Sequence, residues 1–145
     1  MAKKRVLFLC NGNSARSQMA EGIVNALFDG RWEAHSAGIT PFGIVHPLAI
    51  VAMREIGVDI LNQWSKPVSE FRVMRFDLVV TLCGEAQESC PVWLGSGRKL
   101  HLGYPDPAKV DGSPEQRLQT FRDVRDALRH DLEHLLGQPM SHSEE

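Results

Sequence analysis

Short apolar segments alternate with segments of helical periodicity along this chain, and that order constrains the fold more than any other feature. Apolar runs predict strands at 5–10, 32–37, 76–83 and 98–102. The spacing of apolar residues, with proline and glycine at several of the ends, predicts helices at 15–28, 47–56 and 114–136. Strands that alternate with helices indicate an α/β fold, here a single-domain open parallel sheet with helices on both faces.

Length and charge narrow the classes of protein further. The 145 residues correspond to one domain, which we assign to 1–137, with 138–145 as a frayed tail after Gly137-Gln-Pro139. Sixteen Lys+Arg against eighteen Asp+Glu give a net charge of −2, which argues against a nucleic-acid partner held by bulk phosphate attraction. Because no apolar run approaches the ~20 residues of a membrane span, and the short run after Met1 lacks signal-peptide features, we expect a cytoplasmic protein without a membrane partner.

The chain has three cysteines, two of which lie at the ends of predicted strands. Cys10, Cys83 and Cys90 are an odd number, which argues against a static disulfide framework in a reducing compartment and leaves thiol chemistry open. Cys10 and Cys83 end predicted strands, and Asp106 follows another. In open α/β sheets the ligand crevice lies outside the carboxyl ends of the strands, so we expect these three residues to gather at one rim.

The loop after the first strand has the composition of an oxyanion-binding cradle. Its backbone N–H groups and the start of the next helix can converge on one tetrahedral anion. Gly12 permits a left-handed backbone, as does Asn13, and the Arg16 guanidinium offers two parallel donors to anion oxygens. This positive environment favours the nucleophilic thiolate of Cys10, which the Ser17 hydroxyl can stabilise. The predicted binding residues are Asn11, Gly12, Asn13, Ser14, Ala15, Arg16 and Ser17. The alternative is an inert strand-end Cys10 beside a surface Arg16.

The run from Cys10 to Glu21 resembles the signature of the low-molecular-weight protein tyrosine phosphatase superfamily, and more narrowly that of its thioredoxin-coupled arsenate reductases. Ser36-Ala-Gly38 matches the next element of the superfamily, and Asp106-Pro107 matches its general-acid loop. The similarity extends over 4–136, nearly the whole chain. It implies the phosphatase-like α/β fold and an enzyme that binds no cofactor.

The second and third cysteines favour the reductase branch, because the reductases carry a cysteine pair at this place and the phosphatases need none. By that resemblance, Cys10 attacks arsenate, Cys83 attacks Cys10 to release arsenite, and Cys90 then attacks Cys83. Thioredoxin is the implied external reductant, and phosphate or sulfate are analogues of the substrate. Thiol exchange requires each attacking sulfur to reach the next, and the polar residues between Cys83 and Cys90 suit a mobile segment. The alternative is two coincidental cysteines.

Asp106 is the expected general acid, and its carboxylate can also cap the turn at Pro107. The residues after it are Ala108 and Lys109 rather than the aromatic residues that flank a phosphotyrosine ring in the phosphatases. We therefore expect a small inorganic anion as the substrate.

Two features bear on metals. Some relatives have a potassium site whose positions match Asn13, Glu21 and Ser36. That site also has a carboxylate where this chain has Lys66, and we hypothesise that the Lys66 ammonium replaces the cation. The H-x-x-E-H pattern at 130–134 is typical of some zinc proteases. Helical geometry places both histidines opposite the apolar stripe, so we predict no metal site there.

Three other functions stay open at this point. The chain could be a phosphatase of the same fold that acts through a cysteinyl phosphate. It could instead be a phosphocysteine carrier in a sugar-transport relay, which has no use for Arg16. A redox-sensing binding module would form its disulfide without arsenate.

Overall fold

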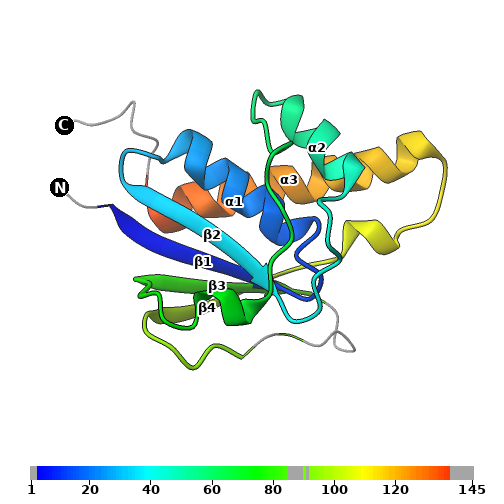
Figure 1. Cartoon of the computed structure of the whole chain (residues 1–145). Coiled ribbons are helices and arrows are strands. Elements are labelled where there is room, and N and C mark those ends of the chain that lie inside the picture. The colour runs from blue at the N-terminus through cyan, green and yellow to red at the C-terminus, as the bar shows by residue number, and fades with distance from the viewer. Residues whose placement is uncertain (1–2, 85–89, 91, 138–145) are drawn as a thin grey trace.

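A parallel sheet of four strands, in the order β2-β1-β3-β4, forms the centre of the molecule (Figure 1). The computed structural model describes residues 3–84, 90 and 92–137; the tail predicted at 138–145 lies outside these residues. The elements in chain order are β1 (Lys4–Cys10), α1 (Arg16–Leu27), β2 (Trp32–Gly38), α2 (Pro47–Arg54), η1 (Val68–Phe71), β3 (Leu78–Cys83), β4 (Arg98–Tyr104), η2 (Pro107–Lys109) and α3 (Pro114–Leu136).

The position of β1 explains its sequence. Residues 6–10 are all buried, and the strand pairs in parallel with β2 on one side and β3 on the other. A parallel strand that is covered on both faces needs apolar side chains in both directions, which a continuous apolar run supplies. At the edge of the sheet, β4 is largely exposed or half-buried, so its sequence signal is weaker.

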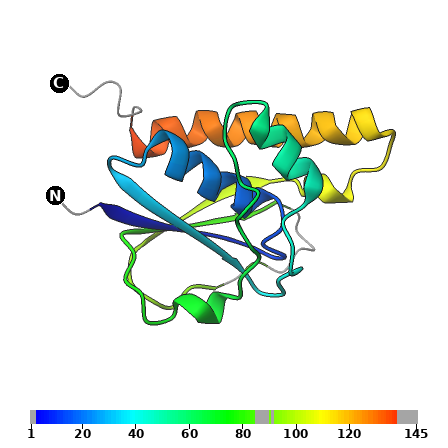
Figure 2. The same ribbon diagram turned by 45° about the horizontal axis from the view of Figure 1, so that its top comes forward.

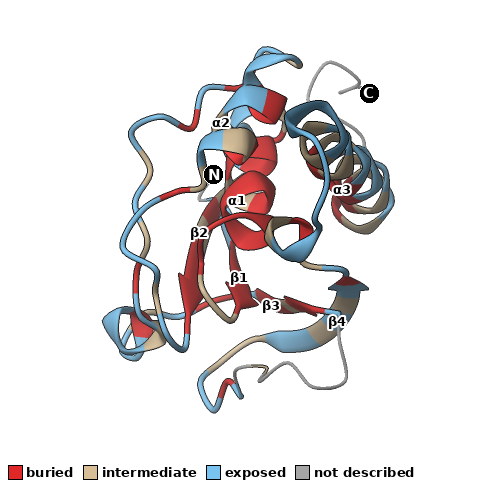
Figure 3. Ribbon diagram, turned by 90° about the vertical axis from the view of Figure 1, so that its right-hand side faces the viewer, coloured by how far each residue is buried: buried red, intermediate tan, exposed pale blue. Residues whose placement is uncertain are grey.

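The two faces of the sheet are covered differently (Figures 2 and 3). All three α-helices lie over one face, where Phe8 of β1 shares a core cluster with Met19 of α1 and Phe121 of α3. On the other face, Leu7 belongs to a smaller cluster that contains the aromatic side chains Phe71, Phe76 and Trp93. The expected α/β fold, a single-domain parallel sheet with helices, is confirmed, and the helices of the two faces differ in kind. In the described part of the chain, the second face carries only the 3₁₀ helix η1 and loops.

The handedness of parallel crossovers explains the course of the chain between β2 and β3, although α2, which belongs to this connection, packs on the face of α1. The β1–β2 connection passes over the face that carries α1. Because β3 lies on the far side of β1 from β2, the next crossover runs back across the sheet, and a right-handed path takes it over the opposite face. That return path begins beside Gly38, which forms an isolated parallel bridge with Pro67, and it continues into the single turn of η1. The path is right-handed as expected, but it contains no α-helix of its own on this face.

The last helix, α3, packs against α1 and α2 and contacts η2 next to the site. Its N-cap is Ser113, whose side chain accepts from the Gln116 N–H while the Gln116 side chain accepts from the Ser113 N–H, which is the predicted capping box. Phe121, Leu128 and Leu132 are fully buried along its inner face. None of the helices in the described residues combines the length and apolarity that a membrane span requires.

Candidate active site

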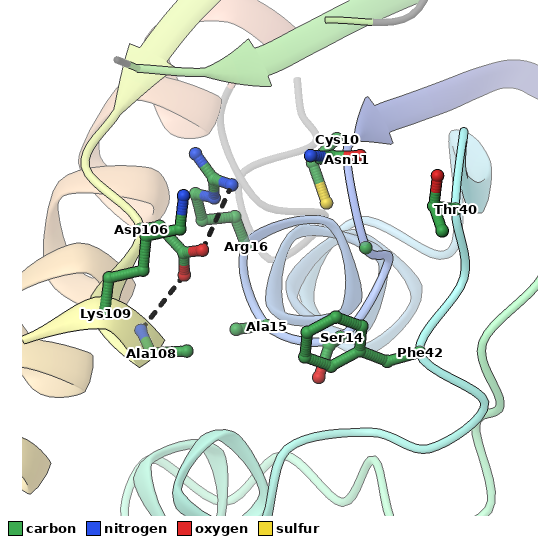
Figure 4. Close-up of a pocket in the computed structure, with 11 residues that line it drawn as sticks. Cys10, Asn11, Ser14, Ala15, Arg16, Thr40, Phe42, Asp106, Ala108 and Lys109 are labelled. Atoms are coloured by element: carbon green, nitrogen blue, oxygen red, sulfur yellow. Dashed lines mark hydrogen bonds and ion pairs between the residues drawn. The ribbon is translucent and has the colours of Figure 1, made fainter. Parts of the chain in front are cut away.

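The carboxyl ends of the strands open into a pocket of about 280 Å³ (Figure 4). Cys10 at the end of β1 and Asp106 just after β4 both line it, as expected from the topology. Cys83 ends β3 beside β1, but neither it nor Cys90 is among the described residues that line the pocket. The full lining is Cys10, Asn11, Gly12, Ser14, Ala15, Arg16, Thr40, Phe42, Asp106, Ala108 and Lys109.

The backbone of the cradle is held from outside by hydrogen bonds to its carbonyl oxygens. The Asn11 carbonyl accepts from the Thr40 N–H at 3.0 Å, and the Gly12 carbonyl accepts from the Phe42 N–H at 3.0 Å. The Ser14 carbonyl accepts from the His46 N–H at 2.9 Å. Carbonyl oxygens repel an anion, so engaging them with outer groups favours a loop that presents N–H groups to the pocket.

Asn13 is the centre of the loop. Its φ of 49° is the left-handed conformation, and its fully buried side chain makes four hydrogen bonds. The amide nitrogen donates to Ser17 Oγ at 2.8 Å and to Ser36 Oγ at 3.0 Å, and the amide oxygen accepts from the Lys66 N–H at 2.7 Å and from Gln18 Nε2 at 3.0 Å. These bonds use the full donor and acceptor capacity of the amide nitrogen and both lone pairs of the oxygen.

Of the two residues that permit a left-handed backbone, Asn13 adopts it and Gly12 does not. A Cβ at residue 12 would lie 3.3 Å from the Phe42 ring, so the exposed ring would have to shift slightly to admit it. Gly38 is required, since its Cβ would lie 2.5 Å from the Asn11 carbonyl oxygen. The end of β2 therefore packs directly against the backbone of the cradle.

The Cys10 thiol has a hydroxyl partner. Ser17 Oγ lies 2.8 Å from Cys10 Sγ, and both groups are buried. Because Asn13 Nδ2 already donates to Ser17 Oγ, the hydroxyl proton of Ser17 can be directed at the sulfur. A hydroxyl donor in this position stabilises a thiolate, the form of cysteine that acts as a nucleophile.

Lys66 occupies the place that the sequence hypothesis gives it. Its side chain is 4% exposed, and Nζ lies 3.5 Å from Glu21 Oε1 and 2.7 Å from the Trp64 carbonyl oxygen. The ammonium also stands 4.8 Å from the centre of the Trp64 ring, a cation–π distance. A partly buried carboxylate is stabilised by a nearby positive charge, which Lys66 supplies for Glu21. That Lys66 replaces a bound potassium ion stays a prediction.

Arg16 and Asp106 form the side of the pocket opposite the loop at 40–42 (Figure 4). Arg16 Nη1 donates to the Tyr104 carbonyl oxygen at 3.0 Å, and Nη2 lies 3.8 Å from Asp106 Oδ2. The other carboxylate oxygen of Asp106 accepts from the Ala108 N–H at 3.0 Å, so Asp106 caps η2 as predicted. The arrangement brings a guanidinium and a partly exposed carboxyl to the same pocket as the Cys10 sulfur.

Comparison with known proteins places this arrangement in a family. The family model described as low molecular weight phosphotyrosine protein phosphatase matches residues 5–144. The chain belongs to this family. It is 45% identical over 128 residues to the arsenate reductase of Halalkalibacterium halodurans, covering 88% of this chain and 91% of that protein. It is 42% identical over 132 residues to the arsenate reductase of Bacillus subtilis, covering 91% and 94%.

Solved structures of the family have the same fold. One, described as an arsenate reductase in the phosphate binding state, superimposes with a TM-score of 0.76 at 35% identity, covering 92% of this chain and 96% of that chain. A low molecular weight protein tyrosine phosphatase from T. tengcongensis superimposes with a TM-score of 0.72 at 27% identity, covering 92% and 98%. The phosphatase-like fold expected from the sequence is therefore confirmed.

Tyr104 was not identified from the sequence, although it anchors the guanidinium of this family member. Its carbonyl oxygen holds Arg16, and its phenol donates to Asp131 of α3. Burial and the hydrogen bond to Asp131 raise the pKa of Tyr104 well above its ordinary value, so the phenol remains a donor. Gly84, which follows β3, packs so closely on the Tyr104 carbonyl that a Cβ would clash with it. The sequence signal that could have identified Tyr104 is its place as an aromatic residue after a predicted strand and before the Asp106-Pro107 loop.

His46 supports the cradle from α2. Its Nδ1 accepts from the Leu48 N–H at 3.1 Å and caps the helix, and its ring lies 4.7 Å from that of Phe121. Burial, assisted by Arg117 and opposed by Asp106, lowers the pKa of His46 below its ordinary value. The neutral ring is the form that can accept the Leu48 bond, so the cap and the lowered pKa agree.

The three cysteines are thiols rather than disulfides. Cys10 and Cys83 are buried, whereas Cys90 is half-buried. Residues 85–89 and 91, which flank Cys90, lie outside the described residues, and the expected mobility of that segment falls on them. The burial of the sulfurs decreases from the predicted nucleophile to the predicted last thiol of the relay.

Proposed function

We propose that this protein reduces arsenate to arsenite with the thiols of Cys10, Cys83 and Cys90, and that thioredoxin restores them. The observation that carries the proposal is a buried Cys10 thiol beside an oxyanion cradle, at the same sheet edge as a second buried cysteine on the neighbouring strand β3. The arsenate reductases to which the chain is similar cover most of its length. Such a thiol cycle belongs in the cytoplasm, where thiols are kept reduced.

The first step is attack of the Cys10 thiolate on arsenic. A sulfur–arsenic bond forms, one arsenic–oxygen bond breaks, and the oxygen leaves as water after Asp106 donates a proton to it. Arg16 and the N–H groups of the cradle bind the remaining arsenate oxygens, and the Ser17 hydroxyl stabilises the sulfur before attack. Arsenic is still pentavalent in the resulting adduct.

The second step transfers electrons. The Cys83 thiolate attacks Cys10 Sγ, a Cys10–Cys83 disulfide forms, and the electron pair of the sulfur–arsenic bond goes to arsenic, which leaves as trivalent arsenite. Cys90 then attacks Cys83, which regenerates the Cys10 thiol and leaves a Cys83–Cys90 disulfide. A dithiol of thioredoxin reduces that disulfide by exchange, so two electrons enter per arsenate. The half-buried position of Cys90 supports its role as the thiol that meets the partner.

The test is oxidation of NADPH by thioredoxin reductase and thioredoxin in the presence of this protein, with and without arsenate. We expect consumption that depends on arsenate and continues over many turnovers. Cys83→Ser should abolish the cycle, and Cys90→Ser should stop it after one arsenite per chain, with a Cys10–Cys83 disulfide detectable by mass spectrometry. Multiple turnovers by Cys83→Ser with thioredoxin would contradict the relay.

The second candidate is hydrolysis of phosphate monoesters through a cysteinyl phosphate, which the family and the position of Asp106 favour. This reaction needs Cys10, Arg16 and Asp106 but not the other two cysteines. Hydrolysis of aryl phosphate by Cys83→Ser at the wild-type rate, with no arsenate-dependent NADPH oxidation by the wild type, would support it. A phosphocysteine carrier is disfavoured, because Arg16 lines the pocket and such a carrier has no use for it.

A further inference from the structure

A second hollow lies at the edge of the sheet where the strands begin, opposite the edge that holds the candidate active site. Because all four strands are parallel, their amino ends share this edge, and the hollow there measures about 710 Å³. Its charged lining residues come from β1, β2 and β4 and from the residues that lead into β1 and β3. Four of them are cationic and two are acidic: Lys3, Arg5, Arg75 and Arg98 against Glu33 and Asp77.

The two carboxylates of the hollow are already engaged by neighbouring groups. Glu33 Oε2 lies 2.6 Å from His35 Nε2 and 3.4 Å from Arg5 Nε. Asp77 Oδ2 accepts from the Arg5 N–H at 2.7 Å. The acidic side chains therefore bind Arg5 and His35 and leave the other cations of the hollow to a ligand.

Those other cations are Lys3, Arg75 and Arg98, and all three are exposed. In the described part of the chain, no carboxylate lies within ion-pair distance of their side chains. Like charges that share a hollow repel one another, and an anion with several charges relieves that repulsion. A guanidinium binds phosphate oxygens through two parallel N–H groups. The hollow thus has the charge and the donors of a site for a ligand that contains phosphate.

The backbone beneath these side chains is fixed by bonds between distant segments. The Asp77 N–H donates to the Arg5 carbonyl at 2.9 Å, and the Arg98 N–H donates to the Asp77 carbonyl at 3.1 Å. Gly97 packs closely on the backbone of Phe76, because a Cβ at residue 97 would lie 2.7 Å from the Phe76 carbonyl oxygen. The spacing of the cations is therefore set by the sheet.

The width of the hollow favours a chain of linked phosphates over a single phosphate. Because β3 lies between β1 and β4, the segments that carry Lys3 and Arg98 are about 10 Å apart, at about 4.8 Å per strand spacing. That separation exceeds the width of one tetrahedral anion. The oxygens of a triphosphate take up about 300 Å³ at about 30 Å³ each, so the hollow also has the volume for one. Phe76, the aromatic residue of the lining, is 4% exposed and offers no face on which a base could stack.

We propose that this hollow is a second anion site, which binds the phosphate chain of inorganic polyphosphates or of nucleoside triphosphates. Its described lining has no residue in common with that of the candidate active site. The proposal therefore goes beyond the reduction of arsenate and does not depend on it.

The test is a titration of isotope-labelled protein with tripolyphosphate at low salt, followed by amide NMR spectra. We expect the largest shifts at residues 3–5, 75–77 and 96–98, with a Kd at least tenfold lower than that of inorganic phosphate at the same residues. Arg75→Gln and Arg98→Gln should each raise the Kd about tenfold, because each removes a charge-assisted contact. Arg54→Gln is the matched control, since Arg54 is an exposed arginine of α2 that does not line the hollow, and it should leave the Kd unchanged. The dispersion of each spectrum shows that the variant is folded.

The same spectra report on the cradle through residues 11–17, which separates the two sites. Shifts confined to 11–17 would overturn the second site and leave the proposed function as it is. An equal rise of the Kd in Arg54→Gln and Arg75→Gln would mean that the net charge attracts the ligand, and would also overturn the site. ATP distinguishes the two sources of the phosphate chain: we expect its Kd within about threefold of that of tripolyphosphate. A Kd for ATP more than tenfold lower would contradict recognition of the phosphate chain alone.

Discussion

The wall of the pocket formed by residues 10–17 is fixed by buried hydrogen bonds, whereas the wall formed by residues 104–109 is held by fewer and more exposed ones. Asn13 alone makes four bonds in the first wall. In the second wall, Asp106 caps one turn and stands 3.8 Å from Arg16 Nη2, at the outer limit of an ion pair. The geometry of the cradle is therefore set by the fold, and the Asp106 carboxyl, the proposed acid, keeps access to water.

Removal of the Asn13 side chain should have the largest effect on stability. Asn13→Ala leaves buried groups of Ser17, Ser36 and Lys66 without their partner and keeps a side chain in the left-handed conformation. We expect the free energy of unfolding to fall by about 3–4 kcal/mol and phosphate binding to be lost. Urea denaturation with and without phosphate measures both.

Asn25→Ala is the matched control for this prediction. Asn25 lies on α1, which follows the cradle, and its amide makes two hydrogen bonds to the backbone of Ala34, away from the pocket. It should cost about 1–2 kcal/mol and leave phosphate binding intact. Equal losses of phosphate binding in the two variants would show that binding follows overall stability rather than the side-chain bonds of Asn13.

Replacement of the acid should break catalysis while sparing the structure of the second wall. The amide oxygen of Asp106→Asn can still accept from the Ala108 N–H, but the side chain cannot donate a proton as a carboxyl does. We expect a fall of about 100-fold in the rate of the first turnover, with the free energy of unfolding within about 0.5 kcal/mol of wild type. Asp111→Asn, at an exposed position nearby, should change neither quantity. An unchanged turnover would exclude Asp106 as the acid.

Loss of the hydrogen bond between Tyr104 in the second wall and Asp131 of α3 should lower the free energy of unfolding less than loss of the Asn13 side chain. Tyr104→Phe removes the hydrogen bond to Asp131 but keeps the carbonyl that holds Arg16. The free energy of unfolding should fall by about 1–2 kcal/mol, while the affinity for phosphate, measured by calorimetry, changes less than about threefold. A loss of affinity as large as that of Asn13→Ala would mean that the two walls are equally dependent on their side-chain bonds.

The smallest predicted effect is the contribution of His46 to the pH dependence of the free energy of unfolding. Because its pKa is lowered in the folded protein, the folded state binds the proton less readily than the unfolded chain. Its stabilising contribution is present above the unfolded pKa of about 6.5 and is lost as the pH falls below it. His46→Asn keeps a helix-capping oxygen that does not titrate. Its unfolding free energy should therefore fall less steeply than that of wild type between pH 7 and pH 5. Parallel curves would assign the pH dependence to other groups.

Features that depend on local sequence were predictable, and those that depend on chain topology were not. The buried run before Cys10 and the capping box at Ser113 each contain their own signal, so β1 and the start of α3 lie within one residue of the prediction. α2 lies in the connection that returns across the second face, yet it packs with α1 and α3 on the first face. The apolar pattern of a helix shows which of its sides is buried but not which face of the sheet it covers.

The site divides in the same way. The cradle is contiguous in sequence, and its residues lie together as expected; of Gly12 and Asn13, which both permit a left-handed backbone, Asn13 adopts it and its side-chain bonds stabilise it. Phe42 lines the pocket and the Tyr104 carbonyl holds Arg16, each from a segment distant in sequence, and neither an exposed loop aromatic nor a strand-end carbonyl has a periodic signal. Lys66 could be placed only through its resemblance to a position in relatives.

The long reach of the bonds around Asn13 has a consequence for the order in which the protein acquires its reactivity. The Lys66 N–H, which donates to the Asn13 side chain, lies 53 residues after Asn13. The Tyr104 carbonyl oxygen, which accepts from Arg16, lies 88 residues after Arg16. A chain that ends before residue 66 lacks the N–H group that closes the loop around Asn13, and one that ends before residue 104 also lacks the carbonyl that holds Arg16. The complete cradle can therefore form only after most of the chain has been synthesised.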